Sequence, residues 1–363
     1  MKELAKIIAF YLPQFHPIKE NDEWWGKGFT EWYNVVKAKP LFRGHYQPKL
    51  PADLGFYDLR LSETRVAQAD LAREAGVYGF CYWHYWFGNG RRLLERPFNE
   101  VVESGKPNFP FCLAWANHSW FAKTWDPNKK DKLLIEQLYP GIDDNEKHFY
   151  ELLPAFRDER YIKVDGKPLF AIFKPLQVDN VSAFIEQWQD LAKQNGLPGI
   201  YFVGQGPQKE FEAILSAGFD AVNHEEVNGI HAHQSTLVRG LKQIQRSLLK
   251  KPRCYDYAKA MKDMIIPEDG KENILPTICP NFDHTPRSGT RGLVYTNSNP
   301  DTFYNHVKQI LEVVTPKQNK IVFLKSWNEW GEGNYMEPDE KYGKGYIEAM
   351  RKAIDDGMAS KTE

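Results

Sequence analysis

Short apolar runs recur along the chain, and most are followed by a stretch with the period of an amphipathic helix. The apolar runs predict strands at residues 6–12, 77–83, 109–115, 168–174, 199–204, 219–223, 274–279 and 320–326. The intervening stretches predict helices at 62–75, 91–104, 143–157, 180–194, 208–216, 300–313 and 344–356. Runs that are apolar throughout, rather than alternating, are typical of parallel strands buried on both faces.

Eight such strands separated by helices predict an α/β fold, a (β/α)8 TIM barrel with extended βα loops. The chain has 363 residues and no evident linker, so we predict a single catalytic domain over residues 1–363. Two regions, about 13–61 and 224–273, interrupt the alternation and are long for plain loops. We predict that both are functional insertions with some helix of their own.

The last predicted strand leads into the segment with the clearest candidate chemistry. Residues 326–333 have the sequence Ser-Trp-Asn-Glu-Trp-Gly-Glu-Gly, which places Glu329 and Glu332 three residues apart after the strand. TIM barrels form their active sites at the C-terminal ends of the strands, and a single helical turn would turn both carboxylates to one side. We therefore predict an acid/base pair. The plainer alternative is a solvated loop or an ion pair at a helix end.

The surroundings of this pair bear on its protonation. A glutamate packed against Trp327 or Trp330 and beside a second carboxylate has its charged form disfavoured. We expect this to raise the pKa of such a glutamate toward that of a general acid.

Polar and aromatic residues also follow the other predicted strands. Aromatic faces beside hydrogen-bonding groups suit sugar rings, although each residue alone could equally be structural. The predicted substrate-binding residues are Tyr11, His84, Tyr85, Trp115, Asn117, His118, Asp283, Trp327, Asn328 and Trp330. For Trp24, Trp25 and Trp32, stacking on more distant sugars and a role in the core are both open.

Composition narrows the choice of partner. The formal net charge is −1, and no basic segment stands out, which argues against nucleic acid and anionic membranes as partners. The chain has 11 Trp and 18 Tyr, which fits a carbohydrate substrate. No run approaches membrane-spanning length and the first residues lack a signal-peptide pattern, so we expect a cytoplasmic protein. Loss of an export signal from a longer chain is the alternative.

Several other chemistries lack their sequence signatures. The chain has no HExxH or paired-histidine spacing, no GxSxG elbow, no phosphate-binding Walker loop and no GxGxxG after the first strand. We therefore predict neither a metal nor a cofactor. Glu225 and Glu226, next to His224, form a rival carboxylate site. Adjacent residues at a strand end point opposite ways, so only one of these two could face a pocket.

Five segments together resemble one protein family, the WbsX-type proteins. They are Phe10-Tyr-Leu-Pro-Gln-Phe-His-Pro17, the segment 22–32, Tyr82-Trp-His-Tyr85, Trp115-Ala-Asn-His118 and the segment 326–333. This family is similar to the family 99 glycoside hydrolases, which are endo-α-mannosidases and endo-mannanases. The resemblance to WbsX-type proteins covers nearly the whole chain. The likeness to family 99 rests mainly on the barrel and the Asn-Glu-Trp-x-Glu-Gly loop.

The resemblance to family 99 implies a retaining mechanism without an enzyme nucleophile. Glu329 would deprotonate the 2-hydroxyl of the sugar, which attacks the anomeric carbon and forms a 1,2-anhydro sugar. Glu332 would protonate the leaving oxygen and then activate water. This chemistry requires a 2-hydroxyl trans to the leaving group, which implies α-linked mannose- or rhamnose-like glycans. The long segment 15–32 departs from family 99 and leaves the exact sugar open.

The family also supplies the competing hypothesis. WbsX-type proteins are commonly labelled glycosyltransferases of bacterial surface polysaccharide (O-antigen or lipopolysaccharide) biosynthesis. Against this, the sequence shows neither Rossmann-like halves nor a DxD motif placed to hold a nucleotide diphosphate. A third class, a sugar-binding barrel without catalysis, would leave the two glutamates idle. Hydrolysis is the leading prediction and glycosyl transfer the alternative.

Overall fold

Parallel strands form a closed ring at the centre of the molecule. The computed structural model describes residues 5–122, 131–227 and 251–359. The ring strands are β1 (Lys6–Tyr11), β2 (Gly79–Trp86), β4 (Phe111–Trp115), β8 (Lys167–Ile172), β9 (Tyr201–Gly206), β10 (Ala221–His224), β12 (Ile274–Leu275), β13 (Thr277–Ile278) and β15 (Ile321–Leu324). Each neighbouring pair in the ring is parallel. The predicted (β/α)8 barrel is confirmed.

The ring closes through a seventh strand that is split in two. Residues 274–279, predicted as one strand, form β12 and β13 on either side of Pro276. Proline has no backbone N–H to donate to a strand ladder, which explains the break. Its carbonyl still accepts a hydrogen bond from the Phe323 backbone at 3.0 Å. Because β12 pairs with β10 and β13 pairs with β15, the split strand joins the two ends of the sheet.

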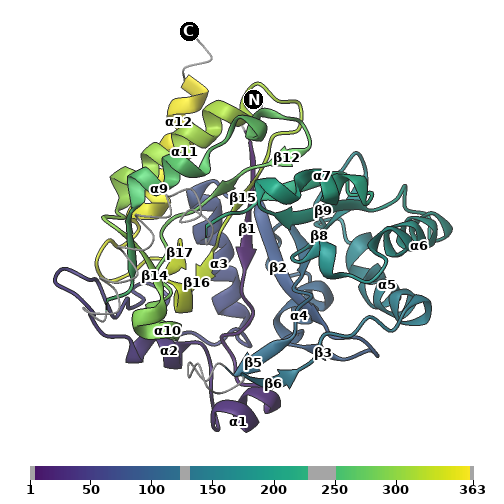
Figure 1. Ribbon diagram of the computed structural model, residues 1–363, viewed down its shortest axis with the longest axis horizontal. Helices are drawn as coiled ribbons and strands as arrows, with labels where there is room; N and C mark the ends of the chain where they lie inside the picture. Colours follow the sequence, from purple (N-terminus) through teal and green to yellow (C-terminus); the bar gives the residue numbers. More distant parts are fainter. Residues whose placement is uncertain (1–4, 123–130, 228–250, 360–363) are drawn as a thin grey trace.

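Helices surround the ring (Figure 1). They are α1 (Lys19–Trp25), α2 (Trp32–Lys37), α3 (Ser62–Ala75), α4 (Arg96–Ser104), α5 (Ile142–Arg157), α6 (Val181–Gln194), α7 (Phe211–Ser216), α9 (Tyr257–Met264), α10 (Thr285–Ser288), α11 (Pro300–Val314) and α12 (Gly345–Ala359). The short strands outside the ring are β3 (Arg92–Leu93), β5 (Trp120–Ala122), β6 (Lys132–Ile135), β7 (Lys163–Val164), β11 (Arg253–Asp256), β14 (Leu293–Thr296), β16 (Asn328–Glu329) and β17 (Asn334–Tyr335).

Two predicted helices begin later than expected. The helix predicted at 91–104 starts at Arg96, because the residues before it form β3 and pair antiparallel with the end of β2. The helix predicted at 208–216 is divided into the 3-10 turn Gln208–Glu210 and α7.

The two predicted insertions contain regular structure of their own. Residues 13–61 include α1 and α2, and residues 224–273 include β11 and α9, while 228–250 lie outside the described residues. In Figure 1 the elements α1, α2, α10, β5 and β6 gather at the end toward which β1 runs, away from the N-terminus. This is the end where the C-termini of the ring strands meet.

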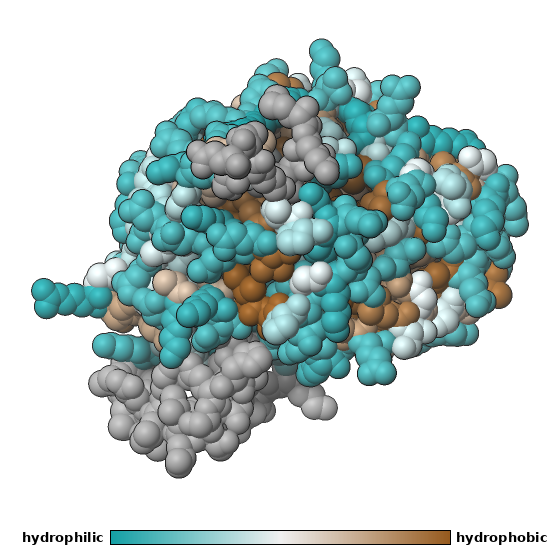
Figure 2. All heavy atoms as spheres, turned by 90° about the horizontal axis from the view of Figure 1, so that it is seen from above, coloured by the Kyte–Doolittle hydropathy of each residue, from teal (hydrophilic) through white to brown (hydrophobic). Residues whose placement is uncertain are grey.

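Both faces of the ring are packed with aromatic side chains. Inside the barrel, Phe10 stacks on Trp83 and on Phe323, with ring centroids 4.7 and 5.0 Å apart. Outside it, Phe170 packs against Trp188 of α6 at 4.9 Å. Two apolar faces explain why the strands lack an alternating pattern. The face seen in Figure 2 is mostly hydrophilic, with its hydrophobic atoms gathered near the middle.

Trp188 offers a test of this packing, because it is fully buried between α6 and the sheet. We expect Trp188→Ala to lower the free energy of unfolding by about 3–5 kcal/mol, through lost contacts and the cavity left behind. Urea denaturation would measure the change. As a matched control, Trp25 is 45% exposed, and Trp25→Ala should change the value by no more than about 0.5 kcal/mol. Equal effects of the two substitutions would contradict the packing described.

Candidate active site

The loop after β15 folds into a hairpin that presents both predicted catalytic glutamates. Strand β16 ends at Glu329, a 3-10 turn covers Trp330–Glu332, and β17 returns antiparallel to β16. Gly333 closes the turn in the left-handed conformation, with φ of 54°, which glycine adopts without steric cost. The helical turn expected between Glu329 and Glu332 is therefore present.

Buried contacts support this hairpin from behind. The Trp330 ring stacks on Tyr335, with centroids 3.7 Å apart and planes 13° from parallel. Its indole N–H donates to Glu337 at 2.6 Å, and Glu337 also accepts hydrogen bonds from Tyr57 and Gln68. Burial raises the pKa of Glu337 to about 7, against these hydrogen bonds. The hairpin is thus anchored to the body of the protein by buried polar groups.

Asn328 ties the same hairpin to the end of β1. Its side-chain oxygen accepts from the Leu12 N–H at 2.7 Å, and its amide nitrogen donates to the Leu12 carbonyl at 3.0 Å. Asn328 is fully buried. Both ends of its amide are therefore used in holding the backbone, and the contact of Asn328 with substrate stays a prediction.

One arginine links the two glutamates to a third carboxylate. Arg287 of α10 donates to Glu329 at 2.6 Å and to Glu332 at 2.8 Å. It also contacts Glu31, the residue before α2, at 2.9 Å. The side chains of Arg287 and Glu332 are 24% and 22% exposed, so solvent reaches both. The glutamate pair therefore sits in a network of three carboxylates around one guanidinium.

The two predicted catalytic glutamates have opposite pKa shifts. Burial raises the pKa of Glu329 to about 7, and the nearby charges of Glu332 and Glu31 add to the rise against the effect of Arg287. Burial also acts on Glu332, but Arg287, His284 and Lys325 outweigh it and lower the pKa of Glu332. The rise in pKa expected for a glutamate of this pair is found at Glu329 and not at Glu332. One carboxyl of the pair thus holds a proton more readily than the other.

Other charged and polar groups face the pair. His284 Nε2 lies 3.7 Å from Glu332 Oε1. Burial raises the pKa of the Tyr85 phenol, with the charge of Glu329 as the next cause. The contact of Tyr85 with substrate stays a prediction. Lys325 pairs with Glu225 at 2.9 Å. Burial opposes the charge of Lys325, but Glu225 and Glu332 raise its pKa.

The rival carboxylates Glu225 and Glu226 are separated in the structure. Glu225 pairs with Lys325 on the side of the glutamate network, whereas Glu226 approaches His224 at 3.8 Å. His224 in turn contacts Asp269 at 2.8 Å. The prediction that only one of the two adjacent glutamates faces the site is confirmed.

Three predicted substrate-binding residues point away from the barrel mouth, toward the surrounding helices. The Tyr11 hydroxyl donates to Gln68 of α3 at 2.6 Å, and His84 contacts His148 of α5 at 2.8 Å. The Trp115 ring packs against His148 and Phe184, from α5 and α6. Successive side chains on a strand alternate between its faces, and these three occupy the outer positions. The structure does not bring these three side chains to the two glutamates, and their contacts with substrate stay predictions.

Other predicted substrate-binding residues hold the structure together. The Asn117 amide bonds the backbone N–H and carbonyl of Lys174, both at 2.8 Å. Asp283 accepts from His45 and Gln47. Burial would raise the pKa of Asp283, but His45, the charge of Lys49 and Thr285 outweigh burial and lower this pKa to about 2. Trp327 and Trp330 are fully buried. These side chains are occupied in packing or hydrogen bonds, and the contacts of all four with substrate stay predictions.

The remaining aromatic candidates differ in exposure. His118 is half-buried and packs on Phe173 at 5.3 Å, and burial, then Lys174, lowers its pKa to about 4. Its contact with substrate stays a prediction. Trp32 belongs to the core, where its indole donates to the Tyr57 carbonyl at 2.8 Å. Trp24 is half-buried edge-on to Trp120, and Trp25 is 45% exposed.

The comparisons with known proteins assign the family. The family model named glycosyltransferase WbsX matches residues 7–350. The chain belongs to the WbsX family. It is 34% identical over 354 residues to the protein WxcX of Xanthomonas campestris pv. campestris, strains B100 and ATCC 33913, which covers 96% of this chain. The chain spans about half the length of these curated relatives.

Solved structures show a similar fold. A glycoside hydrolase-like protein superposes with a TM-score of 0.62 at 16% identity, covering 97% of this chain and 94% of the other. The GH99 endo-alpha-mannosidase from Bacteroides thetaiotaomicron superposes with a TM-score of 0.58 at 14% identity, covering 98% of both chains. At these identities the likeness shows the fold of this WbsX-family chain. In the ranges the structure describes, no helix could cross a membrane.

The pKa of Glu329 predicts how stability depends on pH. A carboxyl whose pKa is raised on folding binds its proton more tightly in the native state, so its contribution to stability is lost as pH rises from about 4.5 to about 7. Glu329→Gln removes this loss. We expect the free energy of unfolding of Glu329→Gln, relative to wild type, to improve by up to about 3 kcal/mol between pH 4.5 and pH 8.

Glu332→Gln is the matched control for this experiment. Because the pKa of Glu332 is lowered on folding, its ionised form stabilises the native state, and that contribution is lost as pH falls. The difference in free energy of unfolding between Glu332→Gln and wild type should therefore become smaller at low pH. Urea denaturation across the pH range measures the free energy of unfolding of both variants. If this free energy, relative to wild type, changed with pH in the same way for both variants, the opposite pKa shifts of Glu329 and Glu332 would be contradicted.

Arg287 should be required for stability at neutral pH. In Arg287→Gln the three carboxylates lose their common cation, and we expect a loss of about 3–5 kcal/mol at pH 8. The loss should be smaller at pH 5, where protonation relieves the repulsion between the carboxylates. Denaturation at both pH values measures this, with the exposed Arg91→Gln as the control. A loss that does not vary with pH would show that Arg287 acts through packing alone.

Proposed function

We propose that this WbsX-family protein is a retaining glycoside hydrolase that acts on α-linked mannose- or rhamnose-like glycans. The observation that carries the proposal is the pair Glu329 and Glu332, on one turn beyond β15 and bound by one arginine. Paired carboxyl groups with different proton affinities are what glycoside cleavage needs. The fold shared with a GH99 endo-alpha-mannosidase supports the choice of sugar.

In the first step the sugar itself supplies the nucleophile. Glu329 takes the proton of the 2-hydroxyl while the oxygen attacks the anomeric carbon, and the bond from that carbon to the leaving oxygen breaks. Glu332 gives its proton to the leaving oxygen. In the second step Glu332 takes a proton from water, which attacks the anomeric carbon and opens the 1,2-anhydro ring, and Glu329 returns its proton to the 2-oxygen. Two inversions at the same carbon give net retention.

The electrostatics of the site bear on these roles. A pKa of about 7 suits Glu329 as a base at neutral pH. Glu332 must be protonated to act as an acid, and in the free site Arg287 favours its ionised form. A substrate that draws Arg287 away would remove the largest effect that opposes burial, leaving those of His284 and Lys325, and would raise the pKa of Glu332. The free site alone would give the acid role to Glu329, so the assignment of roles rests on the family resemblance.

Glycosyl transfer is the second candidate, because the matching family carries the name glycosyltransferase. The same two glutamates could deliver the sugar to an acceptor hydroxyl instead of water. A nucleotide sugar as donor is less well supported. Within the described ranges the main parallel strands form one ring, and a Rossmann-type nucleotide site would need two halves of an open sheet.

Cleavage without any nucleotide sugar is the central test. Wild type should release shorter products from α-mannosyl or α-rhamnosyl oligosaccharides, and mass spectrometry would detect these products. Glu332→Gln and Glu329→Gln should each lower the rate by about 10²–10⁴-fold, the usual contribution of a general acid or base. Glu340, an exposed glutamate beyond the same hairpin, provides the control, and Glu340→Gln should keep the wild-type rate. Product that forms only after addition of a nucleotide sugar would favour the transferase.

The role of the 2-hydroxyl can be tested on the substrate. Methylation of the 2-oxygen at the cleaved residue removes the proton that Glu329 would take. We expect wild type not to cleave this substrate, even with an activated aryl leaving group, while the 3-O-methyl isomer is still cleaved. Cleavage of the 2-O-methyl compound at a comparable rate would exclude participation of the 2-hydroxyl and indicate an enzyme nucleophile or direct attack by water.

A further inference from the structure

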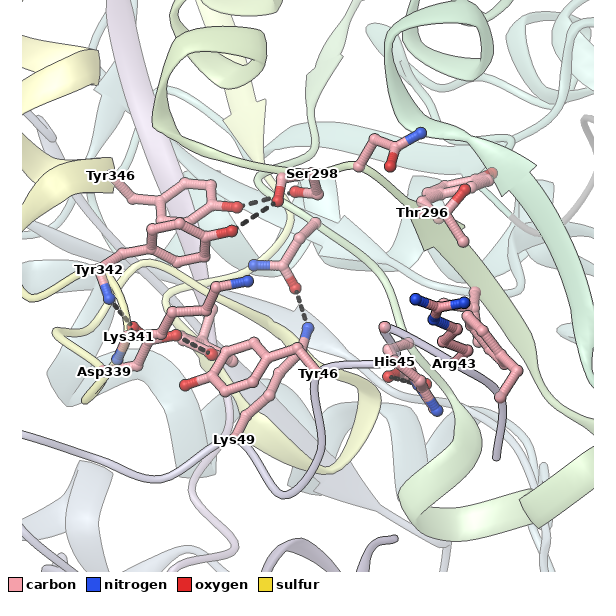
Figure 3. A pocket seen from close by; sticks show the side chains of 18 residues that line it. Arg43, His45, Tyr46, Lys49, Thr296, Ser298, Asp339, Lys341, Tyr342 and Tyr346 are labelled. Atoms are coloured by element: carbon pink, nitrogen blue, oxygen red, sulfur yellow. Dashed lines mark hydrogen bonds and ion pairs between the residues drawn. The ribbon is translucent and has the colours of Figure 1, made fainter. Parts of the chain in front are cut away.

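A second hollow, of about 390 Å³, lies beside the catalytic hairpin and is lined by neither Glu329 nor Glu332. Its walls come from residues 42–49, 281–283, 294–298 and 335–346 (Figure 3). Residues 42–49 lie beyond β1, and residues 281–283 follow β13. Residues 294–298 begin in β14, and residues 335–346 begin in β17 of the catalytic hairpin. Its size falls in the range of pockets that hold small organic ligands.

Tyrosine rings form one side of this hollow. In Figure 3 the rings of Tyr342 and Tyr346 lie side by side, and their hydroxyls converge on Ser298. The Tyr346 hydroxyl bonds the Ser298 hydroxyl at 2.8 Å, and the Tyr342 hydroxyl donates to the Ser298 carbonyl at 3.3 Å. The Tyr46 ring stands edge-on to Tyr342, with centroids 6.3 Å apart. Flat apolar faces with polar edges are suited to sugar rings.

A buried lysine supplies a hydrogen-bond donor at the hollow. Lys49 is 9% exposed, and its ammonium donates to Asn281 Oδ1 at 3.0 Å and to the Gly333 carbonyl at 3.2 Å. An ammonium group has three N–H donors, and these two bonds leave one for an oxygen of a ligand. Lys49 lines the hollow (Figure 3).

The charges around the hollow favour a neutral ligand. Asp283 is bonded to His45 and Gln47, and Asp339 accepts from the Tyr335 hydroxyl and the Tyr342 N–H, both at 2.6 Å. The Lys341 ammonium lies over the rings of Tyr46 and Tyr342, 4.7 Å from each centroid. The hollow is lined by three basic side chains, Arg43, Lys49 and Lys341, and by the two carboxylates Asp283 and Asp339. Because charges of both signs are mixed there, neither a free cation nor a phosphate would gain the concentrated opposite charge that it requires.

We propose that this hollow is a second saccharide-binding site, separate from the two glutamates, that takes one neutral pyranose unit. The choice of a saccharide rests on the proposed function, and the tyrosine rings, the hydroxyl of Ser298 and the donor of Lys49 supply the contacts. The site touches the catalytic hairpin, because Tyr335 lines the hollow and stacks on Trp330, and because Lys49 bonds Gly333. A bound sugar therefore adds contacts to the hairpin that carries the glutamates.

Hydrogen–deuterium exchange with methyl α-D-mannopyranoside and methyl α-L-rhamnopyranoside tests this site on the wild-type protein. At least one glycoside should slow exchange in the peptide that contains residues 293–298. In Tyr342→Ala the glycoside concentration for half of this effect should rise about fivefold or more, the usual consequence of losing one aromatic contact. Tyr33, which is 48% exposed and outside the hollow, provides the control, and Tyr33→Ala should match wild type.

A second variant guards against misfolding of the first. Thr296→Trp would fill the hollow and should abolish the slowing of exchange, and thermal unfolding shows which variants are folded. No slowing at 293–298 in wild type, or equal concentrations for wild type and a folded Tyr342→Ala, would overturn the second site. Cleavage of oligosaccharides is measured in parallel. Slowed exchange at 293–298 without cleavage of oligosaccharides would support the second site and contradict the proposed hydrolase activity. Cleavage without slowed exchange would support the hydrolase activity and contradict the second site.

Discussion

The arrangement of the candidate site depends on one cation between three carboxylates. Arg287, in α10 after β13, contacts Glu31 in the loop after β1 and both Glu329 and Glu332 in the hairpin after β15. Without it, the three buried carboxylates would repel one another and could not all be ionised. With it, the carboxylates still outnumber the guanidinium, and burial together with the charges of Glu332 and Glu31 raises the pKa of Glu329. The contacts of Arg287 thus bring three loops together and contribute to the different pKa values of Glu329 and Glu332.

The hairpin that carries the glutamates is supported by buried side chains. Asn328 fixes it to the end of β1, and the stack of Trp330 on Tyr335 lies against the buried Glu337. Catalytic groups that are held by packing and second-layer hydrogen bonds lose little free energy to rearrangement during reaction. The tryptophans beside the glutamates therefore serve the geometry of the site more than the recognition of sugar.

The sequence predicts the barrel and the glutamate pair because both depend on local patterns. Apolar runs that alternate with helical periods indicate the ring, and the three-residue spacing of Glu329 and Glu332 indicates a turn. The face toward which a strand-end residue points is harder to predict, since a register shift of one residue reverses it. Tyr85 faces the carboxylates, whereas its neighbour His84 packs toward α5. Arg287 had no local signal, because its contacts with Glu31 and the hairpin arise only in the folded chain.

The closure of the ring has a consequence for protein synthesis. Strand β1, near the start of the chain, pairs with β15, and Glu31 meets Glu332 through Arg287. Domains fold as the ribosome releases them from the N-terminus onward. The growing chain can therefore form most of its strands while its carboxylates are still unmatched. Only after β15 and its hairpin leave the ribosome and β15 joins β1 do these contacts form, so a chain that ends before β15 would lack them.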